Sequence, residues 1–136
     1  MMKLVRMVAI VMLFFLGITA LFGSVPMIMD PSGAMLSIPL SLLEHSPFSN
    51  FLIPGVILFC ANCLLSFSAL ALALRKASGY GWQIAVQGCV LAGWISVQVT
   101  MIRSVNWLHY LYWVVALILI LCGWLLRNDA AVRDPG

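Results

Sequence analysis

The sequence predicts an all-α protein in which four transmembrane helices form a bundle. Of 136 residues, 64% are hydrophobic and only 8% are charged, whereas a soluble domain is about one quarter charged. The charged residues leave four long uncharged stretches, each with the roughly 20 residues that cross a hydrocarbon core as a helix. None of the stretches has the period-two alternation of a membrane β-strand. We expect one domain over residues 1–136.

The first expected helix spans residues 4–24. Its basic start and apolar core are also features of a signal peptide. However, its uncharged run is long for that purpose, and no clean small-x-small cleavage site precedes Val25. We therefore expect this segment to remain as a transmembrane helix.

A long outer loop, residues 25–50, joins the first helix to the second, which we expect at 51–74. The letters "DPSG" from Asp30 indicate a turn, and "SIPLSLLEH" from Ser37 predicts a short amphipathic helix. Ser49 or Asn50 is expected to cap the second helix. The loop is too apolar to extend freely into water, so it is predicted to form a lid over the outer ends of the bundle.

The third helix, expected at 82–102, carries two contrasting stripes. One stripe is polar or aromatic and consists of Gln83, Gln87, Trp94 and Gln98. The opposite stripe is small and consists of Gly81, Ala85, Gly88, Ala92 and Ser96. Small residues permit close approach of a neighbouring helix, and amides avoid lipid. Asn62 of the second helix is a natural partner for Gln87 or Gln98. The amides either bridge helices, which we favour, or line a polar cavity.

The fourth helix is expected at 107–126, with His109 in its first turn. Six polar or charged residues are expected at the level of the lid and are the candidates for a ligand or lid site: Asp30, Glu44, His45, Arg103, Asn106 and His109. One hypothesis is that Arg103 pairs with Asp30 or Glu44 and holds the lid. The histidines lack ligand spacing such as H-x-x-x-H, so neither a metal nor another cofactor is predicted.

Cys60 and Cys63 have the C-x-x-C spacing of thiol–disulfide enzymes. They lie well inside the second expected helix, however, and no expected loop contains the further cysteine that would relay electrons. The two cysteines are therefore weak catalytic candidates, and an enzyme is not favoured.

Basic residues indicate the orientation of the chain in a plasma (inner) membrane. An N-terminus in the cytoplasm places six cationic residues on that side: Lys3, Arg6, Arg75, Lys76, Arg127 and Arg133. Only Arg103 then lies outside, so the positive-inside rule predicts that both termini are cytoplasmic. These charges fall in three separate places and form no concentrated patch, so a nucleic-acid partner is not expected.

The motifs "DPSG", "IPLSLLEHSPF" and "FLIPG" occur in the outer loop, and "WISVQVTMI" and "WLHYLYW" follow later. As a set they resemble a family of small bacterial four-helix membrane proteins, over about residues 17–113. The resemblance implies the same fold, but no known activity comes with it.

We expect a non-enzymatic protein that binds a partner protein or a lipid-like ligand at the lid and outer bundle ends. The alternatives are a membrane thiol–disulfide or quinone oxidoreductase using Cys60 and Cys63, and a solute pathway formed by a homo-oligomer. No ionisable residue lies at mid-membrane depth to serve proton-coupled transport. The lipid bilayer is the one partner that composition requires.

Overall fold

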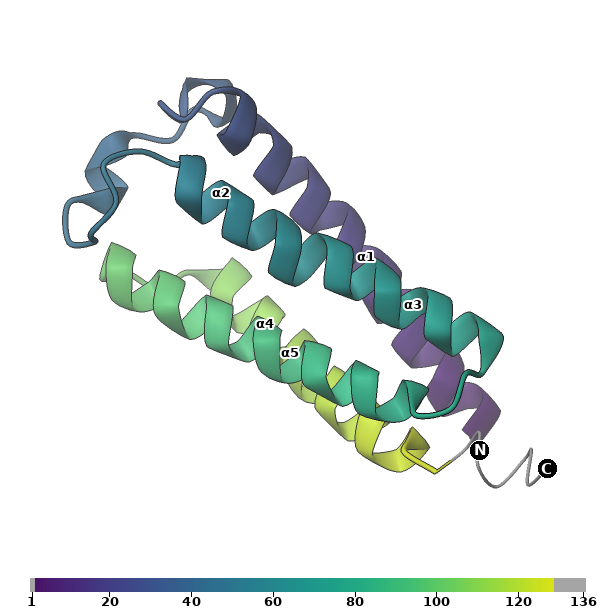
Figure 1. Cartoon of the computed structure of the whole chain (residues 1–136). Coiled ribbons are helices and arrows are strands. Elements are labelled where there is room, and N and C mark those ends of the chain that lie inside the picture. The colour runs from purple at the N-terminus through teal and green to yellow at the C-terminus, as the bar shows by residue number, and fades with distance from the viewer. Residues whose placement is uncertain (1, 129–136) are drawn as a thin grey trace.

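The computed structural model describes residues 2–128, which fold into a bundle of four long helical spans (Figure 1). The first span is α1 (Met2–Met29). The second consists of α2 (Leu52–Leu58), the π-helix η3 (Phe59–Leu64) and α3 (Leu65–Arg75) in one line. The third and fourth are α4 (Tyr80–Ile102) and α5 (Trp107–Leu126). The predicted all-α bundle is confirmed.

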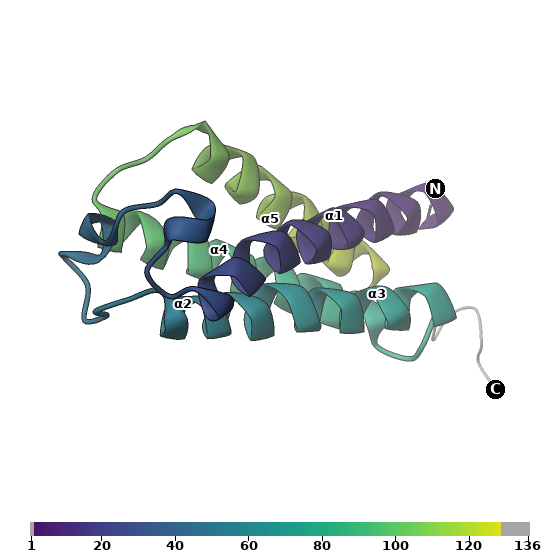
Figure 2. The same ribbon diagram turned by 90° about the horizontal axis from the view of Figure 1, so that it is seen from above.

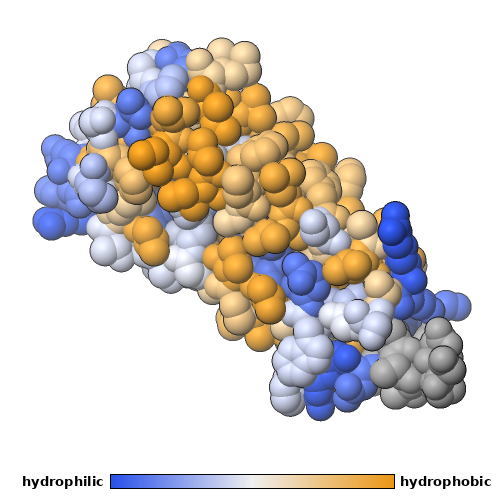
Figure 3. All heavy atoms as spheres, in the orientation of Figure 1, coloured by the Kyte–Doolittle hydropathy of each residue, from blue (hydrophilic) through white to orange (hydrophobic). Residues whose placement is uncertain are grey.

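All four spans are long and apolar enough to cross a membrane. The face shown in Figure 3 has a broad apolar band between two more hydrophilic ends, and many large apolar side chains are exposed along the helices. Such exposure fits lipid rather than water as the surrounding medium. The chain is therefore a multi-pass membrane protein.

The helices are arranged around a close pair, α4 and α5, while α1 packs against α2, α3 and α5 (Figures 1 and 2). The lid, defined here as residues 30–51, lies at the same end as the turn between α4 and α5. We label the lid end of the bundle the outer end and the opposite end the inner end; these labels refer to the bundle and not to a side of a membrane. The inner end contains the start of α1, the turn between α3 and α4, and the end of α5. Five basic residues lie at that inner end: Lys3, Arg6, Arg75, Lys76 and Arg127. Arg103 lies at the lid end. Arg133 is outside the described residues.

The first helix is longer than predicted. The sequence predicted its end at residue 24, but α1 continues to Met29 and contains Pro26. The residues after Pro26 are apolar, and the Asp30 N–H donates to the Pro26 carbonyl at 2.9 Å, so helical bonding resumes past the proline. The outer loop accordingly begins at Asp30 rather than at residue 25. The second span is shifted by one residue, the third begins two residues early at Tyr80, and the fourth matches its predicted bounds.

The small stripe of α4 was predicted to approach a neighbouring helix, and it faces α5. A Cβ at Gly81 would lie 2.4 Å from the carbonyl carbon of Leu126, and one at Gly88 would lie 2.8 Å from the Ala116 oxygen. Gly123 of α5 is equally close, because its Cβ would lie 2.4 Å from the Ala85 nitrogen. The two backbones touch where these residues meet, which is the role of small residues in membrane helix pairs.

At the inner end, Arg6 connects α1 to the last turn of α3. Its Nε donates to the Ala73 carbonyl at 2.8 Å and its Nη2 donates to the Leu74 carbonyl at 3.2 Å. The last carbonyls of a helix lack helical partners and attract cations. The Arg6 guanidinium therefore provides hydrogen bonds to two carbonyls in the last turn of α3 and fixes α1 and α3 relative to each other.

Candidate ligand cavity beneath the lid

The lid is ordered by two short 3₁₀ turns, η1 (Ala34–Leu36) and η2 (Leu40–Leu43). The sequence predicted one amphipathic helix beginning at Ser37. Instead, Ser37 ends η1 with a left-handed backbone (φ 57°), and Pro39 precedes η2 with an extended one. Pro39 disfavours helical geometry at the residue before it, so η2 begins after the proline rather than at Ser37.

Apolar burial and backbone hydrogen bonds hold the lid in place. Leu43 and Phe51 are buried, and the Phe51 N–H donates to the Pro31 carbonyl at 2.9 Å. Gly33 has φ +84°, and a Cβ there would lie 2.4 Å from the Ile38 oxygen and 2.8 Å from the Phe51 ring. Only glycine fits this turn. The Asn50 side chain accepts from the Leu52 N–H at 3.0 Å. The N-cap of α2 is nevertheless Phe51, which makes no side-chain capping bond, so the prediction of Ser49 or Asn50 as the cap is wrong.

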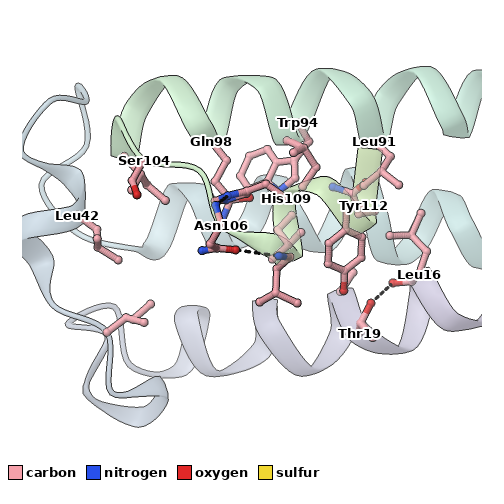
Figure 4. Close-up of a pocket in the computed structure, with 17 residues that line it drawn as sticks. Leu16, Thr19, Leu42, Leu91, Trp94, Gln98, Ser104, Asn106, His109 and Tyr112 are labelled. Carbon is pink, nitrogen blue, oxygen red and sulfur yellow. Dashed lines mark hydrogen bonds between the residues drawn. The ribbon is translucent and has the colours of Figure 1, made fainter. Parts of the chain in front are cut away.

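Beneath the lid lies a cavity of about 530 Å³ lined by 17 residues (Figure 4). Ile38 and Leu42 contribute from the lid. The walls come from α1, α2, η3, α4 and α5 and are mainly apolar, for example at Leu16, Leu91 and Ile95. The rise of α4 between Leu91 and Ile102, both lining residues, is about 16 Å. The cavity therefore runs from the lid to the middle of the bundle.

The outer part of the cavity is bordered by polar side chains from α4, α5 and the turn between them: Gln98, Ser104, Asn106 and His109. His109 is only 6% exposed, and its Nδ1 accepts from the Asn106 N–H at 3.1 Å. The Asn106 Oδ1 in turn accepts from the Leu108 N–H at 2.9 Å. This reciprocal capping box begins α5 and gives both side chains a structural function.

The deep part of the cavity reaches the π-helix η3 at Asn62. Near this point the Leu65 N–H donates to the Cys60 carbonyl, five residues back. The next carbonyl, that of Ala61, accepts from Gln87 Nε2 at 3.1 Å. π-Helical turns often occur at functional sites. Here the π-helical turn places the Ala61 carbonyl within reach of the Gln87 side chain of α4.

The predicted side-chain bridge between Asn62 and a glutamine of α4 is not present. Gln87 bonds to the Ala61 backbone, and both polar atoms of Asn62 are buried without a hydrogen bond to the rest of the described chain. The two interpretations of the polar stripe each hold for part of it. Gln87 bridges helices, while Trp94 and Gln98 line the cavity. Gln83, nearer the inner end, is half-buried and does not line it.

The charged lid candidates do not converge. Glu44 lies 3.3 Å from His45 Nε2 in an exposed pair, and Asp30 Oδ1 accepts from the Ser32 hydroxyl at 2.6 Å. Across residues 2–128, Arg103 forms no ion pair with either carboxylate, so the hypothesis that it holds the lid is wrong. Arg103 is exposed and ends α4 with a left-handed backbone. Within the same residues, no group of His, Cys, Asp and Glu is arranged to hold a metal.

The C-x-x-C cysteines lie in η3 and differ in burial. Cys60 is exposed on the outer surface of the bundle, whereas Cys63 is buried and both are free thiols. Neither lines the cavity. Cys89 and Cys122 are likewise free, the first exposed and the second buried.

Several cavity residues were not predicted. Leu16, Thr19 and Ala20 of α1 lie in a helix that is apolar on every side, so no pattern distinguishes the face that lines the cavity. Tyr112 of α5 also lies in the cavity wall (Figure 4). Asn106 and His109 were predicted at this end of the bundle, and Gln98 in the intramembrane polar stripe.

No family model, curated protein or solved structure matches this chain. The resemblance to small bacterial four-helix membrane proteins stays a prediction, and function has to be argued from the cavity itself.

Proposed function

We propose that this protein is a non-enzymatic binding protein that holds one single-chain, lipid-like molecule in the cavity beneath its lid. The cavity is the observation that carries the proposal. Its volume of about 530 Å³ falls within the range of about 300–1,000 Å³ typical of small-molecule sites. At about 30 Å³ for each water-sized group, it holds roughly 18 such groups, which suits one hydrocarbon chain better than two.

The composition of the cavity supports the same ligand class. Apolar side chains form most of its walls, and its few polar groups lie near Asn62 and around the capping box of α5. None of the 17 lining residues is Lys, Arg, Asp or Glu. A site of this kind favours a molecule that is mostly hydrocarbon, with a small uncharged polar part.

The proposal places the protein in a plasma membrane with both termini in the cytoplasm and the lid on the outer side. The cationic residues at the inner end support this orientation through the positive-inside rule. The lid end would then take up molecules from the outer leaflet or the outer aqueous surface. A partner protein that delivers or receives the ligand would meet the same end.

The test uses a hexadecanol derivative with a photoactivatable diazirine in its chain, added to the purified full-length protein in detergent. We expect saturable labelling by a single copy per chain, with cross-linked peptides from the lid, α4 and the start of α5. Ala20→Phe should abolish saturable labelling, because Ala20 lines the cavity. Ala71→Phe, on the exposed surface of α3, is the matched control and should label as the wild type does.

Labelling that never saturates, or that is unchanged in Ala20→Phe, would contradict the proposal. No observation in the structure favours the two alternatives. Cys60 and Cys63 are free thiols that do not line the cavity, and the cavity ends at mid-bundle without reaching the inner end.

A further inference from the structure

The deep end of the cavity contains polar atoms that a purely hydrocarbon ligand would leave unpaired. Asn62 is 0% exposed, and neither its Oδ1 nor its Nδ2 has a hydrogen-bond partner in the described chain. Asn62 is also a lining residue of the cavity. A buried amide without partners costs about 1–3 kcal/mol for each unmade bond. A ligand group that pairs with Asn62 therefore recovers free energy that a plain alkyl chain does not.

Two further buried groups surround this position on the side away from the lid. Ser66, four residues after Asn62, is 0% exposed and its hydroxyl is unpaired. Gln87 is 1% exposed; its Nε2 is used by the Ala61 carbonyl, and its Oε1 is unpaired. Neither residue lines the cavity. Asn62 is thus the member of this polar group that lies at the cavity wall.

From this arrangement we infer that the ligand is an uncharged single-chain amphiphile whose hydroxyl or carboxamide group binds Asn62 at mid-membrane depth. The inference rests on the proposed function and names the chemical class of the ligand. The Asn62 amide offers one acceptor and two donor hydrogens. A hydroxyl or carboxamide both donates and accepts, so it matches that set. A ketone or quinone only accepts, and it leaves Oδ1 without a donor.

The absence of cationic residues from the cavity lining also favours an uncharged ligand. The ligand's polar group has to enter the dry centre of the bundle, where an ionised carboxylate or phosphate is costly without a cation beside it. The lining residues include neither lysine nor arginine. A neutral head group meets no such cost. The hydrocarbon chain then extends from Asn62 toward the lid, along Leu91 and Ile95.

The test measures competition against the photoactivatable hexadecanol probe, with hexadecanol and hexadecane as unlabelled competitors. We define the selectivity as the hexadecane concentration that halves labelling divided by the hexadecanol concentration that halves labelling. We expect this ratio to be about tenfold lower in Asn62→Leu than in the wild type, because the variant loses one or two hydrogen bonds to hexadecanol in the bilayer-like interior. Comparing the two proteins cancels the partitioning of each competitor into detergent.

Ser66→Ala is the matched control, because it removes a buried unpaired hydroxyl from the same cluster without altering the cavity wall. We expect it to keep the wild-type selectivity within about twofold. Asn62→Leu exchanges an unpaired amide for an apolar group of similar size, a change that tends to be neutral or stabilising, so the variant is expected to fold.

A second measurement needs no variant. On the wild-type protein at alkaline pH, ionised hexadecanoate should compete at least about tenfold more weakly than hexadecanamide, which has the same chain length. Equal competition by these two, or equal selectivity in wild type and Asn62→Leu, would overturn the inference while saturable labelling still upheld the cavity as a binding site. Absence of saturable labelling in the wild type would overturn both proposals.

Discussion

The inner and outer halves of the bundle are made of similar apolar residues but packed in opposite ways. In the inner half, Gly81, Gly88 and Gly123 bring α4 and α5 into backbone contact, and Arg6 joins α1 to α3. In the outer half the same helices line a partly open cavity of about 530 Å³, and the lid contributes Ile38 and Leu42 to its wall. The boundary between the halves lies near Asn62 and Gln87, where the π-helix interrupts the second span.

This difference indicates that the closed inner half supports the open outer half. Helix association in lipid depends on close packing, because burial of apolar groups gives no advantage over contact with acyl chains. The glycine contacts and the Arg6 hydrogen bonds supply that packing at one end. The outer half can then contain a cavity. In a bundle with small residues packed along its whole length, this cavity would be closed.

The largest expected effect comes from the glycines of α4. Gly88→Ala would put a methyl group 2.8 Å from the Ala116 oxygen and 2.7 Å from Ile120 Cγ1. We expect it to reduce the free energy of unfolding by about 3 kcal/mol, since overpacking against a backbone cannot be relieved by a rotamer change. The measurement is unfolding of the detergent-solubilised protein by sodium dodecyl sulfate.

Gly93→Ala is the matched control, because Gly93 is in the same helix and a Cβ there meets nothing within 4 Å. We expect it to be neutral or to stabilise by about 0.5–1 kcal/mol, the helix preference for alanine over glycine. If both variants lost the same stability, close packing in the inner half would not be what distinguishes Gly88.

The second test places the same large side chain in each half. Ala69 is fully buried in the core of the inner half, and Ala20 lines the cavity. Ala69→Phe should cost about 2 kcal/mol through overpacking. Ala20→Phe has space available and should change stability by less than about 0.5 kcal/mol. Both are measured by the same unfolding titration.

If Ala20→Phe were as destabilising as Ala69→Phe, the outer half would be packed like the inner half. That result would also remove the basis for a ligand beneath the lid, independently of any binding measurement.

Much of the fold follows from the sequence because the bilayer imposes it. Charged residues delimit the four spans, and the fourth matched its predicted bounds, Trp107–Leu126. The small stripe of α4 correctly predicted close approach of a neighbouring helix, and the structure identifies that helix as α5. The extension of α1 to Met29 was missed because a proline usually ends a helix, whereas here the apolar residues that follow Pro26 still lie within the span.

The site was predicted less completely. Asn106 and His109 were expected at the outer end, and Gln98 was expected in the intramembrane polar stripe; all three border the cavity. The π-helix was not predicted, because nothing in "FCANCL" distinguishes it from an ordinary helix, and it is what turns the Ala61 carbonyl toward Gln87. The position of the cavity depends on how far apart the outer ends of α1 and α4 stand, and no residue pattern reports that distance.

The capping box of α5 gives a smaller effect at the rim of the cavity. Asn106→Ala removes the acceptor for the Leu108 N–H and should cost about 1 kcal/mol. His109→Gln keeps an acceptor for the Asn106 N–H and should retain most of the stability. If the two variants lost the same free energy of unfolding, the His109 imidazole would have a stabilising function beyond capping α5. Unfolding titrations measure both.

The smallest effect is expected at Arg103, and it tests what holds the lid over the outer half. Arg103 is exposed and has no acidic partner among residues 2–128, so Arg103→Gln should alter stability by less than about 0.5 kcal/mol and leave proteolysis of the lid unchanged. Phe51→Ala is the contrasting variant, because the buried Phe51 ring packs beside Gly33. It should speed cleavage within the lid, since the lid is fixed by apolar burial. Faster cleavage in Arg103→Gln than in Phe51→Ala would instead show that charge, and not packing, closes the cavity.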